Sequence, residues 1–180
     1  MTLDRQSRLD SAVGVWTAWL ECPEVIERGE RRRFVQASLD ESDLYRDGAQ
    51  PTRFAADPLP GIYPAHALRR ASGAPDPFDR LLDDPNWDGA DVGWTSVGLP
   101  DLQLERPRLV NAGSRVVLYG LAHIGDRLRQ RSCYLEVAEL DGRSGPMTRV
   151  VTRTEYANQV GDMLLVMDNA VICRAAEDAT

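Results

Sequence analysis

The clearest pattern in the sequence is an alternation of apolar and polar residues over its C-terminal half. Four such segments follow one another, with turn residues between them: SRVVLYGLA, RLRQRSCYLEVAEL, MTRVVTRTEYAN and MLLVMDNAVICR. In the third segment one face carries Thr148, Val150, Thr152, Thr154 and Tyr156, and the other carries Arg149, Arg153 and Glu155. A period of two with one polar face predicts antiparallel strands over residues 108–175, covered on one side. The last segment is apolar on both faces, which predicts a place near the centre of the sheet.

The N-terminal part of the chain has a helical pattern instead. Apolar residues recur there at helical spacing, as Leu9, Val13, Trp16 and Leu20. This spacing predicts an amphipathic helix within residues 1–22 that ends at Cys22-Pro23. The following stretch GERRRFVQAS predicts a second, short helix, with Phe34 and Ala37 facing inward and with Arg31, Arg32 and Arg33 facing solvent.

Residues 48–107 are rich in Pro, Gly and Asp and predict a long covering loop. Only PAHALRRAS in this stretch has a helical pattern, with Pro64 suited to a first turn and Gly73 suited to a C-terminal stop. A helical segment followed by a run of antiparallel strands indicates the α+β class. We therefore predict one domain over residues 1–180, with the sheet wrapped around one central helix.

Composition and charge remove several classes of function. The 180 residues carry 21 basic and 28 acidic side chains, a net charge of −7, which argues against a nucleic-acid-binding protein. No run approaches the ~20 apolar residues of a membrane span, and the first ten residues, MTLDRQSRLD, lack the apolar core of a secretory signal. We therefore expect a cytoplasmic protein without a membrane partner. No GxxxxGK[ST] or GxGxxG motif occurs, so the common nucleotide cradles are absent.

The metal-binding residue types are few and scattered. Cys22, Cys133 and Cys173 form no CxxC pair, and His66 and His123 are the two histidines. A zinc site needs clustered ligands, so we expect three reduced thiols, no metal and no cofactor.

Two parts of the chain together resemble a known family. The front part is RGERRRFVQASLDESDLYRD, and the longer back part runs from NAGSRVVLYGLAHIGDRLRQ through TEYANQVGD to the last strand. Both are similar to the MaoC-like (R)-specific hydratase/dehydratase family, which has the hot-dog fold, and within it to the branch found as N-terminal dehydratase halves. The front part is similar to that family's pattern of an aromatic residue, a small-residue helix and Gly-Asp-x-Asn-Pro-Leu-His. The two parts span about half of the chain.

The resemblance implies a chemistry and a set of positions. Adding water to a 2-enoyl thioester, or removing it from a 3-hydroxyacyl thioester, requires proton transfer at two carbons and stabilisation of charge on the thioester oxygen. In the family a carboxylate and an imidazole from one loop move the protons. A backbone amide at the start of the hot-dog helix holds the thioester carbonyl. By resemblance Asp40 occupies the aspartate position, and Ala65 lies where the amide is expected.

The same loop departs from the family pattern at four positions. Leu39 replaces the glycine, Ser42 the asparagine, Asp43 the proline and Tyr45 the histidine. Tyrosine has a reference pKa of about 10 against about 6.5 for histidine, so it is a poor proton shuttle at neutral pH. By resemblance, such a tyrosine is usual in halves whose partner carries the working Asp/His pair.

Each candidate residue has a functional and a structural interpretation. Asp40 either moves protons or caps backbone amides of a turn. Tyr45 either donates a hydrogen bond to the thioester or packs. His66 either supplies the missing base or lies at a helix start, and His123 is interpreted as structural.

The arginines also allow two interpretations. An acidic protein that binds a coenzyme A or acyl-carrier thioester needs a local basic patch for its phosphates. Arg127, Arg129 and Arg131 alternate along a strand and are the candidates, with Arg143, Arg149 and Arg153 as a second set. The alternative is an ordinary charged sheet surface.

Three functional hypotheses follow from the sequence. The first is a subunit of an (R)-specific 2-enoyl-thioester hydratase or 3-hydroxyacyl-thioester dehydratase, paired with a homologous hot-dog subunit. The second is a self-sufficient homodimer that uses Asp40 with Tyr45 or His66. The third is a non-catalytic protein that binds acyl thioesters. A dimer is expected in the first two cases, because hot-dog sheets generally pair edge-on.

Overall fold

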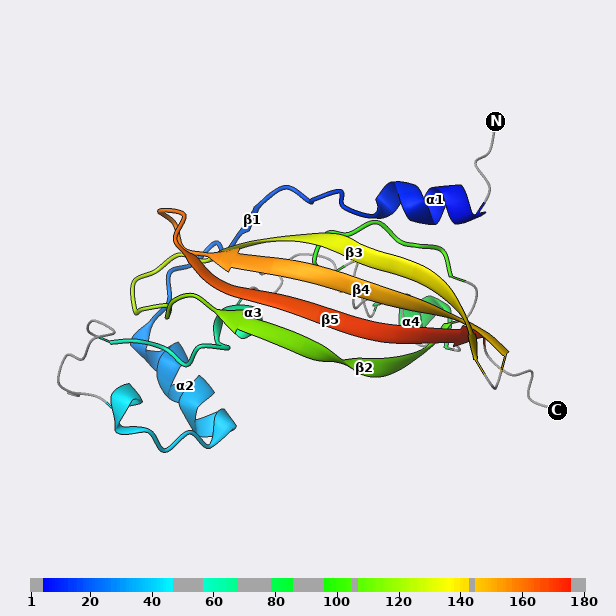
Figure 1. Cartoon of the computed structure of the whole chain (residues 1–180). Coiled ribbons are helices and arrows are strands. Elements are labelled where there is room, and N and C mark those ends of the chain that lie inside the picture. Colours follow the sequence, from blue (N-terminus) through cyan, green and yellow to red (C-terminus); the bar gives the residue numbers. More distant parts are fainter. Residues whose placement is uncertain are drawn as a thin grey trace.

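The computed structural model of the chain describes residues 5–46, 57–67, 79–85, 96–104, 107–142 and 145–175. Five strands of the described residues form one sheet in the order β1-β3-β4-β5-β2, and every pairing is antiparallel. The strands are β1 (Leu20–Glu21), β2 (Pro107–Leu118), β3 (Arg129–Gly142), β4 (Gly145–Ala157) and β5 (Met163–Ala175). Figure 1 shows the four long strands running side by side along the length of the molecule.

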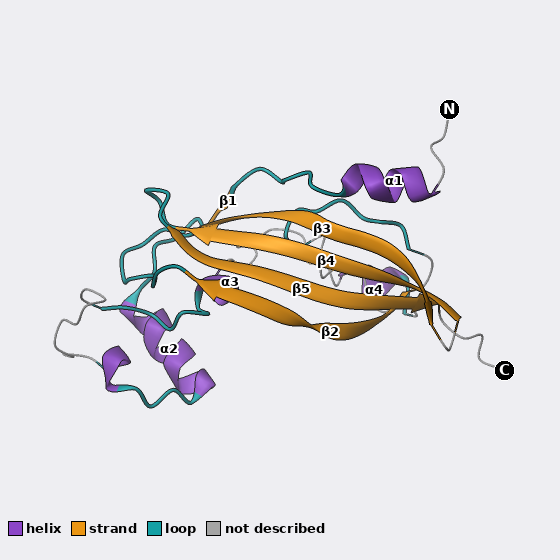
Figure 2. Cartoon of the chain, viewed as in Figure 1, coloured by secondary structure: helices purple, strands orange, loops and turns teal. Residues whose placement is uncertain are grey.

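The helices are short and lie around this sheet (Figure 2). They are α1 (Arg5–Ala12), α2 (Arg28–Ser38), α3 (Pro64–Ala67) and α4 (Arg80–Asp83), with a 3-10 turn, η1, over Asp43–Tyr45. In Figure 1, α2 lies at one end of the sheet, and α3 and α4 lie behind it. The predicted α+β class is confirmed. Of the central helix predicted over residues 64–72 the structure describes α3, and residues 68–72 lie outside the described part. None of the described helices is long and apolar enough to cross a membrane.

The alternation predicted for β4 is confirmed. Thr148, Val150, Thr154 and Tyr156 are buried on one face, whereas Arg149 on the other face is exposed. β5 pairs with β4 on one side and β2 on the other, so its apolar pattern does correspond to an interior strand. β2 begins at Pro107, before the predicted segment SRVVLYGLA. A bulge between Asn111 and Ser114 interrupts the alternation in the first part of this strand, so the pattern does not reveal that part. Gly113 has a φ of 104° at this bulge, a conformation that suits glycine.

The helix predicted within residues 1–22 is shorter than expected. α1 ends at Ala12, and Gly14 follows with a φ of 77°. The chain beyond it is extended along β3: Gly14 N–H donates to the carbonyl of Tyr134, and Thr17 N–H donates to that of Ser132. These hydrogen bonds to the edge of β3 take the place of the hydrogen bonds that this segment would make within a helix. The helical spacing of Trp16 and Leu20 therefore does not correspond to a helix.

Two clusters of buried residues cover the same face of the sheet at its two ends. One cluster joins α3 and the preceding loop to the strands: Ile26, Leu59, Tyr63, Ala122, Leu128, Tyr156, Leu164 and Leu165. The other joins α1 and the loop around Leu99 to the strands: Leu9, Leu99, Tyr134, Val137, Val150 and Cys173. Burial of this apolar surface is the main stabilising contribution to the fold.

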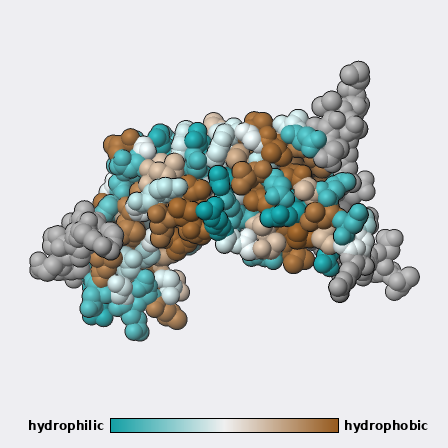
Figure 3. Space-filling model, in the orientation of Figure 1, coloured by the Kyte–Doolittle hydropathy of each residue, from teal (hydrophilic) through white to brown (hydrophobic). Residues whose placement is uncertain are grey.

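The other face of the sheet carries cross-strand ion pairs. Arg131 pairs with Glu155 (2.7 Å), Arg149 with Glu136 (3.3 Å) and Arg153 with Asp168 (2.7 Å). In Figure 3 hydrophilic side chains lie between hydrophobic areas over the strands, so no single apolar surface covers the view.

The orientation of α2 differs from the prediction at Ala37, which is exposed rather than inward-facing, and at Arg31. Arg31 does not face solvent: it is 1% exposed, and its Nη1 donates to Asp57 Oδ1 at 3.1 Å. Nη2 of Arg28 is 3.6 Å from Oδ2 of the same carboxylate. A long arginine side chain can be buried where a carboxylate meets its guanidinium, and a pattern of charged residues along a helix does not reveal such a partner. α2 is thereby attached to the loop at residue 57.

We predict that Asp57→Asn destabilises the protein by about 2 kcal/mol, because it leaves the buried charge of Arg31 without its carboxylate. Asparagine keeps the shape of the side chain and tolerates the φ of 54° at this position. Urea unfolding of the two proteins measures the change. The matched control is Asp43→Asn, which removes the exposed Asp43–Arg46 pair (2.8 Å) and should change stability by less than about 0.5 kcal/mol. Equal effects of the two substitutions would contradict the proposed weight of the Arg31–Asp57 contact.

Candidate functional site

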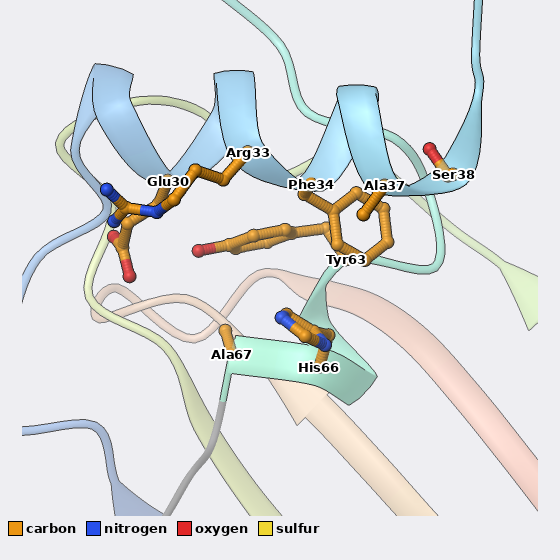
Figure 4. A pocket seen from close by; sticks show the side chains of 8 residues that line it. All are labelled: Glu30, Arg33, Phe34, Ala37, Ser38, Tyr63, His66 and Ala67. Atoms are coloured by element: carbon orange, nitrogen blue, oxygen red, sulfur yellow. The ribbon is translucent and has the colours of Figure 1, made fainter.

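A cavity of about 540 Å³ lies between α2 and α3. Its lining residues come from these two helices and the residue before α3: Glu30, Arg33, Phe34, Ala37, Ser38, Tyr63, His66 and Ala67 (Figure 4). Its volume is within the range of small-molecule sites in proteins. We consider this cavity as the candidate site because it contains His66, one of the candidate residues that the sequence indicates.

Three rings form one side of this cavity. The Phe34 and Tyr63 ring centroids are 5.2 Å apart and nearly perpendicular, and the His66 centroid is 5.1 Å from that of Phe34. Edge-to-face packing of this kind holds aromatic rings in a fixed arrangement. Tyr63 is 2% exposed, and in Figure 4 its hydroxyl points toward the end of the cavity at which Glu30 and Arg33 lie.

The N-terminus of α2 determines the position of Glu30. Glu27 is the N-cap residue, and its backbone N–H donates to Glu30 Oε2 at 3.0 Å in a capping box. The Glu30 carboxylate is thus held at the positive end of the helix, where a negative charge is stabilised.

Asp40 lies just beyond the C-terminal end of α2 and not among the lining residues. Its Oδ1 accepts the backbone N–H of Ser42 at 3.0 Å, and Ser42 Oγ accepts the N–H of Leu44 at 3.3 Å. These are turn-capping bonds, which agrees with the structural interpretation of Asp40. The carboxylate is partly accessible, so the structure leaves its proposed catalytic role untested.

Tyr45 ends η1 and lies near Asp40. Partial burial raises the pKa of Tyr45 above its usual value, and the negative charge of Asp40 raises it further. The phenol therefore stays protonated at neutral pH and can donate a hydrogen bond but not accept a proton.

His66 is exposed and lines the cavity, whereas Asp40 and Tyr45 are not among the lining residues. The structure brings Asp40 and Tyr45 close together. The backbone N–H of Ala65, the predicted thioester amide, donates to the carbonyl of Ile62 at 3.1 Å. To hold a thioester carbonyl, this N–H would have to share or give up its hydrogen bond to Ile62. The role of the Ala65 amide therefore stays a prediction.

The arginines predicted to bind phosphates have partners within the protein. Nη1 of Arg127 donates to the carbonyls of Cys22 and Pro23. The Arg131 guanidinium lies 4.5 Å from the Trp16 ring centroid and 4.8 Å from that of Trp19, in addition to its bond to Glu155. Arg129 lies 4.6 Å from the Trp19 centroid. These contacts support the structural interpretation, and the phosphate-binding prediction stays untested.

The second set of arginines and His123 are also accounted for in part. Arg149 and Arg153 are in the cross-strand pairs described above, and Arg143 lies outside the described residues. His123 Nδ1 is 3.7 Å from Asp126 Oδ2 in a turn between β2 and β3, in keeping with a structural role. Among the described residues, no group of three or more His, Cys, Asp or Glu side chains is arranged to hold a metal ion.

Arg33 is exposed, as the sequence predicts, and it also lines the cavity. Arg31, two residues earlier on the same helix, is buried. The only signal in the sequence was its position one residue before Phe34.

A family comparison matches most of the chain. The model described as "FAS1-like, dehydratase domain region" matches residues 11–167, and the chain therefore belongs to this dehydratase family. No curated protein sequence matches the chain.

Solved structures with the same fold are MaoC-like proteins and hydratases. The ChsH1-ChsH2 complex from Mycobacterium tuberculosis contains a chain that matches with a TM-score of 0.68 at 10% identity, over 98% of this chain and 99% of that one. A MaoC-like dehydratase from Rhodospirillum rubrum matches with a TM-score of 0.58 at 16% identity, covering 93% and 96%. The R-hydratase PhaJ1 from Pseudomonas aeruginosa matches with a TM-score of 0.54 at 15% identity, covering 91% and 83%. The predicted MaoC-like hot-dog fold is confirmed.

We expect Leu39, one of the departures from the family loop, to lower the free energy of unfolding. Leu39, at the position of the family glycine, has a φ of 53° and is 84% exposed. The N–H of Asp40 donates to the carbonyl of Val35, which closes the helix in the way that usually requires glycine at this point. We predict that Leu39→Gly stabilises the protein by about 1 kcal/mol, because it removes the left-handed strain of a residue with a Cβ.

Thermal and urea unfolding measure this effect. The control is Gln36→Gly, at an exposed position inside α2, which should destabilise the protein by about 1 kcal/mol. Destabilisation by both glycines would show that the Leu39 side chain has a favourable contact that outweighs the strain.

Proposed function

We propose that this chain is the accessory subunit of an (R)-specific 2-enoyl-thioester hydratase or 3-hydroxyacyl-thioester dehydratase, and that a homologous hot-dog partner supplies the Asp/His pair. The observation that carries the proposal is the state of the loop after α2. Asp40 caps its own turn, the neighbouring Tyr45 has a raised pKa, and neither residue lines the cavity that contains His66. The family chemistry uses a carboxylate together with an imidazole, and this loop carries Tyr45 at the position of the histidine.

The fold comparison supports a paired assembly. The chain aligns over nearly its whole length with a chain of a structure described as a complex, ChsH1-ChsH2. A homologous arrangement here would place a second hot-dog sheet beside this one, and the acyl thioester would bind between the two.

The edges of the sheet indicate where the partner would bind. The edge of β3 is covered by the segment from Val13 to Glu21, through the hydrogen bonds of Gly14 and Thr17 and the pairing of β1. At the other edge, β2 pairs with β5 alone among the described strands. Apolar side chains are exposed along and just beyond β2: Leu109 37%, Val110 47%, Val116 42%, Leu118 55% and Tyr119 64%. An edge of this kind pairs readily with another strand, and we assign the partner to it.

The decisive experiment compares the lone chain with the coexpressed pair. The partner is a hot-dog protein with an intact Asp-x-Asn-Pro-x-His loop, and hydration of crotonyl-CoA is followed by loss of enoyl absorbance. We expect little or no turnover by the lone chain and turnover by the pair. Val116→Lys at the β2 edge should prevent copurification of the partner, whereas Val160→Lys, at a turn residue that is 74% exposed, should not.

A self-sufficient enzyme is the second candidate, favoured by the position of His66 in the cavity. It predicts robust turnover by the lone chain that Asp40→Asn or His66→Asn abolishes. That result would overturn the accessory role. A lone chain that binds an acyl thioester tightly, without turnover in any pairing, would instead favour a binding protein.

The pH profile of the active pair tests the role of Tyr45. If the partner's imidazole transfers the proton, kcat/KM should change with a pKa near 6.5. The raised pKa of Tyr45 means that its phenolate forms only above about pH 10, so Tyr45→Phe should leave the profile between pH 5 and 9 unchanged. A change in the shape of that profile in Tyr45→Phe would place the phenol in the proton transfer.

A further inference from the structure

We propose that the cavity between α2 and α3 binds the anionic group of the ligand through Arg33, so that this arginine selects among acyl thioesters. The inference rests on the proposed function and specifies how the same site recognises its ligand. The shared chemistry is an anionic oxygen group, either a phosphate of the thioester carrier or a carboxylate on the acyl group.

The arginines of the protein differ in whether another residue holds them. The protein carries a net charge of −7, so an anionic ligand needs a local cation. Arg127, Arg131 and Arg153 are held by carbonyl or carboxylate oxygens of the protein, and Arg31 is buried against Asp57. Arg33 differs from them: no hydrogen bond or ion pair joins it to another residue within the described part of the chain.

The position of Arg33 in the cavity also supports the proposal. Arg33 lies on the rim, with the rings of Phe34, Tyr63 and His66 forming the adjacent apolar wall (Figure 4). A Cβ on Gly29 would lie 3.7 Å from Arg33 Nη1, so the arginine side chain extends back along α2 toward its first turn. A ligand with an apolar body against the rings would have its charged end within reach of the guanidinium.

The acidic group of the cavity does not cancel this cation. The Glu30 carboxylate is on the same helix, but its Oε2 is held by the N–H of Glu27 in the capping box. The N-terminus of α2 further compensates its charge. Tyr63 and Ser38 contribute hydroxyl groups, and His66 contributes an imidazole ring. An arginine can bind a phosphate or carboxylate with two parallel hydrogen bonds, which supplies both affinity and orientation.

The test uses two neighbouring substitutions on one helix, Arg33→Gln and Arg32→Gln. Both arginines are exposed on α2, but only Arg33 lines the cavity, so Arg32→Gln controls for net charge and helix stability. Calorimetric titration of the full chain and of the coexpressed pair gives Kd for three probes. The probes are crotonyl-CoA, crotonyl-pantetheine and glutaconyl-pantetheine, which carry the anion on the carrier, no anion, and the anion on the acyl group.

We expect Arg33→Gln to weaken binding of one anionic probe about tenfold and to leave crotonyl-pantetheine unchanged, with Arg32→Gln within about twofold of wild type throughout. Loss for crotonyl-CoA identifies the carrier phosphate as the ligand group, and loss for glutaconyl-pantetheine identifies an acyl carboxylate. Indistinguishable Kd values for the two variants, in a pair that binds and hydrates thioesters, would overturn the role of Arg33 while the proposed function stands. A wild-type pair that binds none of the probes would overturn both.

Discussion

The candidate site depends on the contact between Arg31 and Asp57, which holds α2 at the end of the sheet. The two residues are 26 positions apart in sequence, and their atoms approach to 3.1 Å with the arginine buried. The loop at residue 57 is in turn hydrogen-bonded to the turn before β3, through Leu59 N–H to Ala122 and Ile124 N–H to Asp57. α2, the segment before α3 and the sheet are thus one connected unit, and the cavity lies where α2 faces α3.

The loop that follows α2 departs from the family pattern although the surrounding fold is retained. The dehydratase fold is present over most of the chain, and the rings of Phe34 and Tyr63 are packed in a defined geometry. The loop that follows α2 is also ordered by hydrogen bonds, but these bonds use the carboxylate of Asp40 to cap the turn. A loop with Tyr45 at the position of the family histidine is consistent with the assembly that we propose, in which a second hot-dog chain supplies the Asp/His pair.

The arginines of the protein have structural contacts in some places and a proposed binding role in another. Several arginines contact other residues of the fold, through cross-strand pairs on the sheet and through packing of Arg131 against the rings of Trp16 and Trp19. The contacts of Arg131 join the N-terminal segment to β3 and help it to cover that edge, whereas β2 is the other edge among the described strands. For Arg33, which lines the cavity, we propose a role in recognition instead.

The sequence by itself determined the α+β class, the four long strands and the covered face of β4, because the period-two alternation of Thr148 to Tyr156 reflects local backbone geometry. It also located the loop from Leu39 to Tyr45, through its similarity to a family pattern. The extended course of Trp16 to Leu20, the burial of Arg31 and the place of His66 in the cavity were decided by the tertiary structure. Each of these depends on a partner far away in sequence: the open edge of β3, the carboxylate of Asp57 and the packing of α3 on the core. Local periodicity carries no information about such partners, so residue spacing alone could not show which arginine is buried or which side chains meet in the cavity.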